Sequence, residues 1–519
     1  MAHRGIIAAG HPATVEAARL VLADGGNAFD AAIAGLCAAC MAEPVLVSLG
    51  GGGFLLAHRG RQTLVYDFFA QTPRRRRPPA QVDFRPVHAD FGTATQEFHI
   101  GLGAAATPGV VRGLFAVHRD LGSIPMARLV EPALALAREG VLWSDFQTYI
   151  FDVVAPIYRA RAETAAHFAS PSRPGELLRA GDRFRAPELA DLLESMAIEG
   201  DRLFYEGEVA RRLTQACDTE GGHLTLEDLA HYRVERRSPL AVDYRGHRLL
   251  TNPPPSCGGI LIAFALALLE QTEPALLGYG TPAHLQLLAA IMEASNRARL
   301  ESRLRDLPAD SQAPALLGGE LLARYRRSLL GRYASLRGTT HLSIVDAAGD
   351  AASLTVSNGE GCGYLLPGTG VMLNNMLGEE DINPYGLQRW PVDRRMASMM
   401  APSLLLSPDG TVTALGSGGS NRIRTAILQV LSNLLDFQMA VEAAVDAPRI
   451  HLEDALLNVE GGFPEPTYGA LADRFPEHRF WPGHNLFFGG AHCVRSNPRR
   501  RLLEAHGDPR RGGASAILV

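Results

Sequence analysis

The alternation of apolar and polar positions is clearest just after residue 339. Residues 342–346 and 351–357 are rich in β-branched and apolar side chains, and residues 347–350 between them have the composition of a turn. This pattern predicts a β-hairpin. Folding the hairpin about Ala348 and Gly349 places Thr339 opposite Ser357 or Asn358.

The chain before this hairpin is predicted to be mainly helical. A strand over 5–9 is followed by an amphipathic helix over 14–24 and by a helix over 28–41 that is apolar nearly all round, which predicts burial. Four glycines at 50–53, ahead of a strand over 54–58, indicate close approach of two backbone segments. Residues 304–338 form a polar surface connector, whose end is accessible to a cut.

The chain after the hairpin is predicted to alternate strands with glycine-rich turns. Strands over 403–406 and 412–415 lead into the glycine-rich segment 416–422, which opens a helix over 423–435. A Gly-Gly turn at a helix start presents free backbone N–H groups. An oxyanion hole requires such groups, and any tight strand-to-helix turn also has them.

Composition narrows the classes of function. The 519 residues are 46% hydrophobic, enough for one large core or for two to three ordinary ones. A net charge of -5 gives no electrostatic case for a nucleic-acid partner, and no apolar run is long enough to span a membrane. The N-terminus lacks the apolar core of a secretory signal, which favours a cytoplasmic location.

The six cysteines show no disulfide framework. Cys37 and Cys40 have the spacing of a redox motif, but they lie in the apolar helix, which favours a buried pair. No cluster of cysteine, histidine and carboxylate residues has the spacing of a metal site, and the sequence indicates no cofactor.

Thr339 is the candidate nucleophile. If the peptide bond before it were cut, the new α-amino group could take the hydroxyl proton, which is the threonine version of nucleophile activation. Taken alone, the pair Thr339-Thr340 is more typical of β-branched residues that fill a strand. His341 lies on the same strand face as Thr339, and a structural role is favoured for it because the α-amine already serves as the base.

Several motifs, taken in their order along the chain, favour the catalytic interpretation of Thr339 over the structural one. The chain resembles the γ-glutamyltranspeptidase family, in the N-terminal nucleophile hydrolase superfamily, over nearly its whole length. The resemblance is carried by the segments GNAFDAAIA (26–34), GGGGF (50–54), PPPSCGG (253–259), TTHLSIVD (339–346), PGTGVMLNN (367–375) and DPRRGGA (508–514).

The resemblance implies an α+β fold, a four-layer αββα sandwich. It also implies self-cleavage between Gly338 and Thr339, which divides the chain into a large region of residues 1–338 and a small region of residues 339–519. Thr339 would be the nucleophile, Ser357 would supply a hydroxyl that hydrogen-bonds it, and the backbone of Gly419 and Ser420 would form the oxyanion hole.

The recognition residues depart from the family pattern. Phe69 follows Asp67-Phe68 where γ-glutamyl enzymes of the family have an arginine that grips the substrate carboxylate, and a phenylalanine does not replace that bidentate contact at small cost. The family's glutamine and aspartate are replaced by Met376 and Glu379, and one of its paired serines by Met399. The predicted substrate-binding residues are therefore Phe69, Asn358, Glu379 and Ser398.

Three functional hypotheses follow. In the first, the enzyme cleaves γ-glutamyl amides such as glutathione by way of a threonine acyl-enzyme, with Arg112, Arg422 or the basic run 74–77 as the missing cation. In the second, the same nucleophile acts on a non-glutamyl acyl amide, which the apolar Phe69 favours. In the third, the chain stays uncut and serves as a non-catalytic binding protein.

The expected partners are small molecules. They are the amide substrate and, for the second step, water or an amine acceptor, with neither nucleic acid nor membrane involved. The two fragments are expected to stay associated, and a homodimer is left open.

Overall fold

The structure is a computed structural model, and it describes residues 4–90, 95–302, 307–318, 321–322, 324–325, 339–383, 385–453 and 455–519. The predicted hairpin is present, with strands β11 (Thr340–Asp346) and β12 (Ala351–Ser357) in antiparallel register. Thr340 pairs with Val356, so the same register carried one residue further sets Thr339 opposite Ser357. Gly338 lies outside the described residues.

The hairpin occupies the middle of a seven-stranded sheet. Its neighbours on both sides come from the first part of the chain, because β1 pairs with β11 and β2 pairs with β12. In spatial order the sheet is β22 (Ala514–Leu518), β1 (Gly5–Ala9), β11, β12, β2 (Gly52–Arg59), β3 (Gln62–Phe68) and β8 (Glu235–Arg237).

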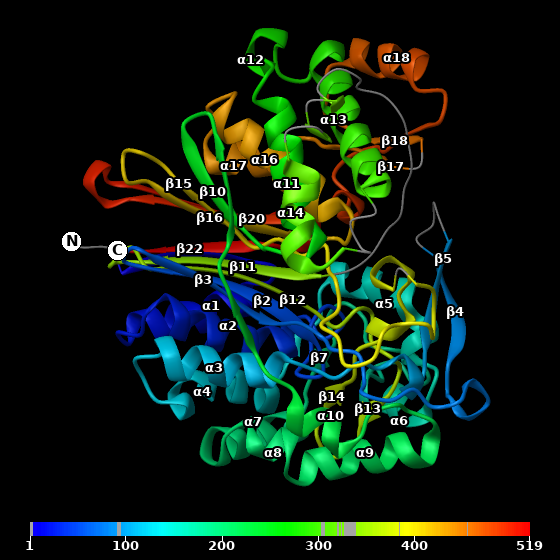
Figure 1. Ribbon diagram of the computed structural model, residues 1–519. Coiled ribbons are helices and arrows are strands. Elements are labelled where there is room, and N and C mark those ends of the chain that lie inside the picture. Colours follow the sequence, from blue (N-terminus) through cyan, green and yellow to red (C-terminus); the bar gives the residue numbers. More distant parts are fainter. Residues whose placement is uncertain are drawn as a thin grey trace.

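A second, six-stranded sheet packs on the first (Figure 1). All of its pairings are antiparallel. In spatial order it consists of β21 (Leu502–His506), β20 (Gly490–Asn497), β16 (Val412–Gly418), β15 (Ser403–Leu406), β10 (His247–Thr251) and β9 (Leu240–Tyr244).

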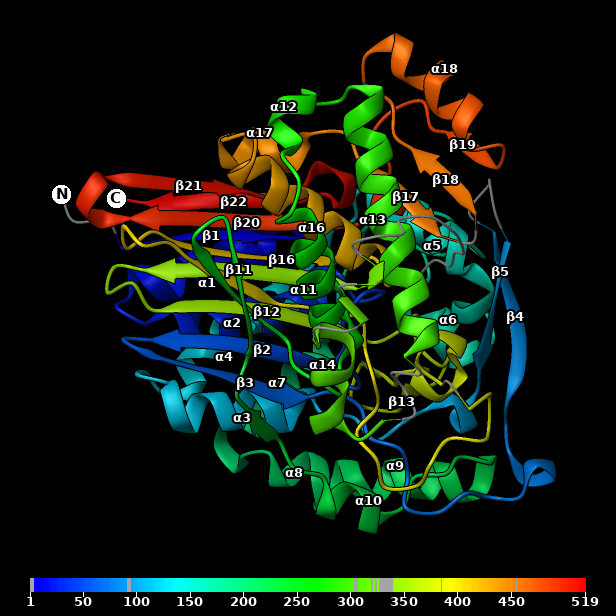
Figure 2. The same cartoon turned by 45° about the horizontal axis from the view of Figure 1, so that its top comes forward.

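Helices cover the outer face of each sheet, which gives four layers (Figures 1 and 2). The layer on the seven-stranded sheet contains α1 (Pro12–Ala23), α2 (Ala28–Ala42), α3 (Val110–Leu121) and α4 (Met126–Glu139), with α7 (Pro187–Glu199) packed on α4. The layer on the six-stranded sheet contains α11 (Cys257–Leu269), α13 (Pro282–Glu301), α16 (Arg422–Leu435) and α17 (Val441–Asp446).

The remaining α-helices and strands lie outside the two large sheets. The helices are α5 (Asp145–Tyr158), α6 (Ala162–His167), α8 (Arg202–Tyr205), α9 (Glu208–Glu220), α10 (Leu226–His231), α12 (Pro274–Leu277), α14 (Ala309–Leu317) and α18 (Glu465–Arg474). The strands are β4 (Arg85–Asp90), β5 (Thr95–Ile100), β6 (Val141–Leu142), β7 (Arg183–Phe184), β13 (Leu365–Leu366), β14 (Val371–Met372), β17 (Ile450–Glu453), β18 (Leu456–Val459) and β19 (His478–Phe480).

The core has two parts, and β11 contributes to both because successive side chains of a strand point to opposite faces. Leu342 and Ile344 pack in the cluster between the sheet and its helices, whereas Val345 packs in the cluster that fills the space between the sheets. Every residue of β11 and β12 is buried. The hairpin therefore sits in the most protected place in the fold.

Local sequence explains how α2 is aligned with the hairpin. The side chain of Asn27 caps the helix by accepting from the N–H groups of Phe29 and Asp30, and Asp30 reciprocates at the Asn27 N–H. The Asp346 carboxylate, at the end of β11, accepts from the Ala28 N–H at 2.9 Å. Cys37 and Cys40 lie in this buried helix as free thiols, as predicted.

Contacts with other segments fix two element boundaries. Helix α11 begins at Cys257, because the Ser398 carbonyl accepts the Cys257 N–H and anchors the first turn. Strand β14 ends at Met372, because Asn374 turns its side chain to the backbone of Gly50 and Ala106.

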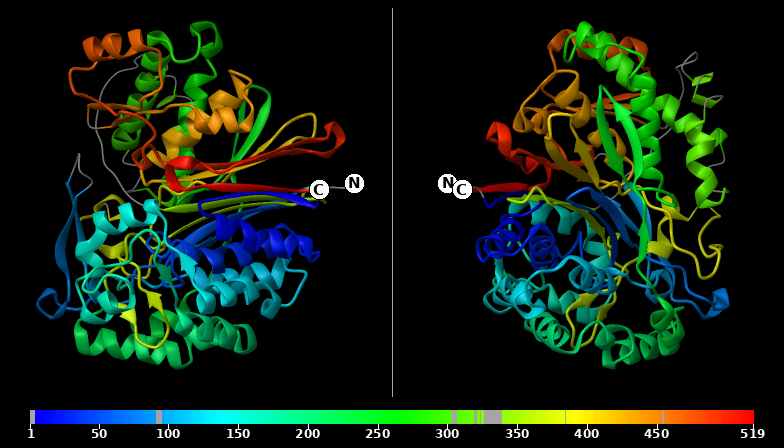
Figure 3. Two further views of the ribbon diagram at one scale, coloured as in Figure 1. Left: turned by 180° about the vertical axis from the view of Figure 1, so that it is seen from behind. Right: turned by 60° about the vertical axis from the view of Figure 1, so that its left-hand side comes forward.

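Both described ends of the chain lie at one edge of the sheet (Figure 3), where the Arg4 N–H donates to the Leu518 carbonyl at 2.9 Å. Within the described part of the chain, no helix has the length and hydropathy needed to span a bilayer.

Candidate active site

Thr339 lies at the start of β11, buried between the ends of the two sheets. Its carbonyl oxygen accepts a hydrogen bond from Arg511 Nη1 at 3.2 Å. The same oxygen lies so close to Gly418 that a Cβ atom on Gly418 would be 1.8 Å from it. Only glycine fits there, so the end of β16 is held directly against the candidate nucleophile.

Ser357 ends the neighbouring strand β12, in the register position opposite Thr339. Its hydroxyl is buried and accepts the Gly359 N–H at 3.0 Å. The predicted pair of hydroxyl-bearing residues is thus brought together by strand register alone.

Gly419 and Ser420 form the turn between β16 and α16. Both have left-handed backbones, with φ of +117° and +51°, and their carbonyl oxygens accept from the N–H groups of Arg422 and Ile423 at the helix start. Because the carbonyl groups of these two residues point into the helix, their N–H groups point away from the helix. Gly418, which immediately precedes this turn in the chain, touches Thr339, so the turn lies next to the candidate nucleophile. Its N–H groups are arranged as an oxyanion hole requires.

Two buried charges flank the threonine pair, and sequence reasoning assigned no role to either. Glu43, which follows α2, accepts hydrogen bonds from the hydroxyls of Thr340 at 2.7 Å and Thr14 at 3.1 Å. Burial raises the pKa of Glu43 to about 7, although these two hydrogen bonds and the charge of Arg511 oppose the rise. Burial lowers the pKa of Arg511 to about 10. Arg511 belongs to the segment 508–514 that carried the resemblance, which was the one signal that could have found it.

A small cavity of about 40 Å³ adjoins this site. One wall is apolar and comes from residues 45–46 and from α5. The other contains Gly359, which bonds to Ser357, and the charged residues Glu360, Arg422 and Arg511. This cavity is the candidate pocket for an acyl group bound to Thr339.

Two of the predicted substrate-binding residues lie beside Ser357. Glu379 is buried, and one of its carboxylate oxygens would be 2.3 Å from a Cβ atom on Gly359, so it closes over that glycine. Asn358 is also buried, with its N–H bonded to the Leu46 carbonyl at 3.2 Å. The described residues that line the small cavity include Gly359 and Glu360 but not Asn358.

The other two lie farther along the sheet. Phe69 is 1% exposed and stacks on Phe54 with ring centroids 5.4 Å apart. Its backbone abuts Gly52, which pairs with Ser357. The Ser398 hydroxyl accepts the Met400 N–H at 3.0 Å, and the Ser398 carbonyl binds the start of α11, so this serine is held by backbone contacts.

Of the cations considered as substitutes for the missing arginine, only Arg422 lines the small cavity among the described residues. Arg112 is engaged elsewhere, with Asp201 at 2.7 Å and with the face of the Tyr205 ring. In the basic run, Arg74 and Arg77 pair with acidic residues at the surface, as expected of a solvated loop.

His341 has a structural environment, in line with the expectation for it. Its two ring nitrogens are within 2.8 Å of the hydroxyls of Thr355 and Ser343, and its ring packs on Gly416 between the sheets. Burial lowers the pKa of His341 well below its usual value, so the ring is neutral near pH 7. Within the described part of the chain, no group of three or more histidine, cysteine or carboxylate residues could hold a metal ion.

Two antiparallel sheets stacked between helical layers, with a threonine that begins a central strand, define the N-terminal nucleophile hydrolase class. The chain belongs to the γ-glutamyltranspeptidase family, whose sequence model, described as Gamma-glutamyltranspeptidase, matches residues 14–518. It is therefore an amidohydrolase or acyltransferase of the N-terminal nucleophile type.

Individual relatives fall into two groups. The chain is 30% identical to the "Acylase ACY 1 proenzyme" of Pseudomonas sp. (strain V22), over 97% of this chain and 91% of that protein. It is 29% identical to the "Glutathione hydrolase proenzyme" of Escherichia coli (strain K12), over 91% and 85% of the two chains. Its fold is similar to the crystal structure of cephalosporin acylase from Bacillus halodurans, with a TM-score of 0.84, 25% identity and coverage of 99% of this chain and 96% of that one.

Proposed function

We propose that this protein is a self-cleaving amide acylase whose acyl group is not glutamyl. The observation that carries the proposal is Phe69, buried and stacked on Phe54 at the position where the resemblance expects a carboxylate-binding arginine. A buried aromatic pair offers no hydrogen bond to a carboxylate, and an ionised carboxylate left unpaired in such a place costs far more than the roughly 2–7 kcal/mol of an unpaired neutral polar group.

The proposed chemistry uses the arrangement around Thr339. Cleavage before Thr339 releases its α-amine, which takes the proton of the Thr339 hydroxyl as Oγ attacks the carbonyl carbon of the substrate amide. The N–H groups of Gly419 and Ser420 receive the oxyanion. The C–N bond then breaks, the amine leaves with the proton, and an ester of Thr339 remains.

The second half of the reaction frees the enzyme. Water, or another amine, gives up a proton to the α-amine and attacks the ester carbonyl, and Thr339 Oγ departs with that proton. The buried hydroxyl of Ser357, in the register position opposite Thr339, is proposed to hydrogen-bond Oγ and keep it oriented. The Arg511 contact to the Thr339 carbonyl would hold the residue once its N-terminal side is cut.

A second candidate, the cleavage of γ-glutamyl amides, is supported by a different observation. Arg422 and Arg511 both line the small cavity beside Thr339, and either guanidinium is a suitable partner for the α-carboxylate of glutamate. In this alternative the carboxylate is bound on the side of Thr339 away from Phe69.

Three 4-nitroanilides separate the candidates: γ-glutamyl, 4-aminobutanoyl, which lacks the α-carboxylate, and butanoyl, which lacks both the carboxylate and the amine. The acylase proposal expects kcat/KM for the butanoyl compound to equal or exceed that for the γ-glutamyl compound. A preference for the γ-glutamyl compound of more than about 100-fold, equivalent to one charge-assisted contact or more, would favour the second candidate instead. Thr339→Ala protein provides the background rate.

The location of the protein is also a proposal. We infer a cytoplasmic protein, a location supported by the six cysteines, which are all buried as free thiols, as in proteins of a reducing compartment. Fractionation of cells that express the natural gene, with detection by an antibody to the folded protein, tests this inference.

A further inference from the structure

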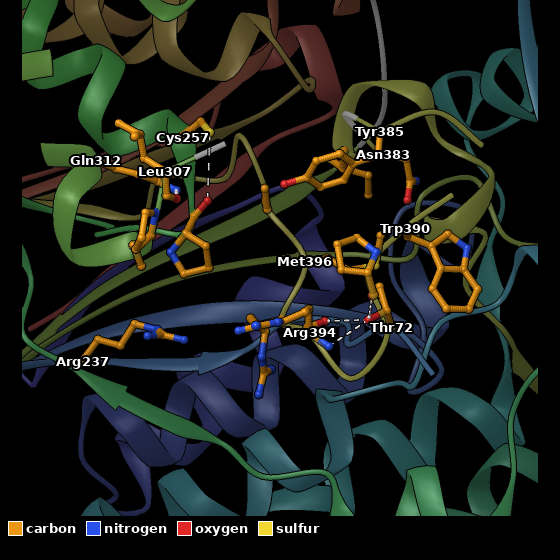
Figure 4. A pocket seen from close by; sticks show the side chains of 17 residues that line it. Thr72, Arg237, Cys257, Leu307, Gln312, Asn383, Tyr385, Trp390, Arg394 and Met396 are labelled. Carbon is orange, nitrogen blue, oxygen red and sulfur yellow. Dashed lines mark hydrogen bonds between the residues drawn. The ribbon is translucent and has the colours of Figure 1, made fainter. Parts of the chain in front are cut away.

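A second and much larger cavity is lined by residues that include Thr72, Arg394 and Met396 (Figure 4). Its volume is about 580 Å³, within the usual range for sites that bind small molecules. Its walls come from β8, the start of α11, α14 and the segment 382–397, and they include Thr72, Arg237, Cys257, Tyr385, Trp390 and Arg394.

The charge of this cavity is of one sign. Three arginines line it, Arg237, Arg394 and Arg395, and among its described lining residues there is neither an aspartate nor a glutamate. Behind the wall, the fully buried Asp67 pairs with Arg237 at 2.8 Å and with Arg395 at 3.4 Å, and the charge of Glu235 also acts on Arg395. Arg394 has no ion pair within the described part of the chain, so positive charge remains at the lining of the cavity.

Two of these arginines have donors to spare. The Nε of Arg237 donates to the Asp67 carboxylate, whereas its two terminal nitrogens have no hydrogen-bond partner among the described residues. Arg394 is exposed, and its guanidinium has no ion pair or hydrogen bond within the described part of the chain. Arg395 is different, because its guanidinium is buried and bonds to the Phe69 carbonyl, the Tyr232 hydroxyl and the Arg233 carbonyl.

The remaining walls suit the body of an organic ligand. In Figure 4, Arg237 and Arg394 lie along one side of the cavity, Tyr385 and Trp390 lie toward one end, and Cys257 and Leu307 lie across from the arginines. Guanidinium groups on one side and rings on another fit a molecule with an anionic end and an apolar part.

Backbone contacts connect this cavity with the nucleophile. Ser357, opposite Thr339, pairs with Gly52, and Gly52 abuts the Phe69–Ala70 backbone. The Ala70 carbonyl accepts the N–H of Met396 at 3.0 Å, and Met396 lines the cavity. Four steps at the strand spacing of about 4.8 Å give a path of roughly 19 Å from Thr339 to Met396, and the straight-line separation is no longer than this path. A ligand of that length spans the cavity and the nucleophile.

We propose that the large cavity binds the carboxylate end of an elongated amine, which is the leaving group or the acceptor of the acyl transfer. The carboxylate lies against Arg237 and Arg394, and the amine points toward Thr339. This inference rests on the proposed acyl-transfer chemistry but not on the identity of the acyl group.

Direct binding is the first test, and it needs no turnover. The probes are the tripeptide Gly-Gly-Phe and its C-terminal amide, which differ only in the carboxylate, and calorimetry measures their Kd for the wild-type protein. The acid is expected to bind about tenfold or more tightly than the amide, as one charge-assisted contact provides. Arg394→Ala should remove that difference, and Arg394→Lys should restore part of it.

The matched control is Arg389→Ala. Arg389 is an exposed arginine in the same segment, but it does not line the cavity, so its removal should leave both Kd values unchanged. Equal affinity for acid and amide in the wild type, or an equal effect of Arg389→Ala and Arg394→Ala, would overturn the proposal.

A kinetic arm separates the two sources of the amine. With a neutral anilide as acyl donor, an acceptor would yield a new acyl-tripeptide detectable by mass spectrometry, whereas a leaving-group analogue would only inhibit hydrolysis competitively. Either result supports the site, provided that Arg394→Ala weakens it and Arg389→Ala does not. A protein that binds the acid selectively but cleaves no amide would keep the carboxylate site and would overturn both the proposed function and the role of the bound amine in it.

Discussion

The small cavity beside Thr339 and the large cavity beside Arg394 are built in different ways. The first is bounded by α5, by residues that follow strand β12 and by buried, hydrogen-bonded charges such as Arg422 and Arg511. The second is bounded largely by the connecting segment 382–397, and two of its arginines, Arg237 and Arg394, keep unused donors. In the proposals made above, strand register positions the groups that carry out the chemistry, whereas side chains on a connection select what is bound. Changes in the first region should therefore affect all substrates, and changes in the second should affect the choice between them.

The largest expected effect comes from the first region. Thr339→Ala should leave a single uncut chain of 55.7 kDa, whereas the wild type should separate into residues 1–338 and 339–519 on denaturation. Amide hydrolysis should fall by at least about 10⁴-fold, because loss of a nucleophile removes the covalent route for every substrate. Intact-mass spectrometry and the anilide assay measure the two outcomes. Thr339→Ser serves as the control that keeps a hydroxyl, and an uncut wild type would instead support a non-catalytic binding protein.

A second effect concerns the buried charge behind the nucleophile. The pKa of Glu43 is about 7 in the folded protein and ordinarily 4.5, so between these values the folded state binds a proton that the unfolded chain has lost. Its protonated form therefore stabilises the fold fully below pH 4.5, and this contribution of about 3 kcal/mol is lost as the pH rises through 7. Glu43→Gln mimics the protonated form and should not lose it.

Urea unfolding of the wild type and of Glu43→Gln at pH 4.5 and pH 8 measures this difference. The variant should gain about 3 kcal/mol relative to the wild type at the higher pH. Glu16→Gln, on the exposed face of α1, is the control and should show no such gain. Parallel pH curves for Glu43→Gln and wild type would contradict the assigned shift.

A third prediction probes the border between the two regions. Phe69→Arg should raise the ratio of kcat/KM for γ-glutamyl over butanoyl anilide by about tenfold, because it restores a charge-assisted contact to the glutamyl carboxylate. Because both kcat/KM values are measured on the same preparation, their ratio does not change if part of the protein is unfolded. Phe69→Leu, which removes the ring without adding charge, should leave the ratio unchanged. A lower ratio in the arginine variant would indicate that the carboxylate binds elsewhere.

The smallest effect is expected at the oxyanion turn. Ser420 holds a left-handed backbone that glycine adopts more easily, so Ser420→Gly should raise the free energy of unfolding by about 1 kcal/mol. It should change kcat by no more than about twofold, because the proposed mechanism uses only the N–H of residue 420. Thermal unfolding and the anilide assay test this together. A tenfold loss of kcat would mean that the Ser420 hydroxyl takes part in the reaction.

The sequence alone predicted the first region well. The hairpin follows from local composition and a short turn, and its register fixes the position of Thr339 relative to Ser357 without any side-chain information. The buried helix over 28–42 follows from a nearly continuous apolar run. Such features depend on residues close together in the chain, so a single sequence contains the information.

The second region was not predicted. The large cavity joins residues 72, 237, 257 and 394, which are separated by more than a hundred positions in most pairs, and no local pattern connects them. Arg511 and Glu43 were missed for a similar reason, because their roles come from contacts with Thr339 and Thr340 across the two sheets. The basic run at 74–77 drew attention by its composition, yet Arg74 and Arg77 are paired at the surface.

The place of β11 and β12 between β1 and β2 also constrains how the chain is made. During synthesis, β1 and β2 emerge early, but the two strands that must separate them follow about 290 residues later. At roughly 5–20 residues per second, the first part of the sheet waits about 15–60 s with its inner edges unpaired. The nascent chain therefore carries these two facing strand edges unpaired for most of its synthesis. The hairpin that follows Thr339 fills the gap between them, and only afterwards are β22 and four strands of the second sheet made.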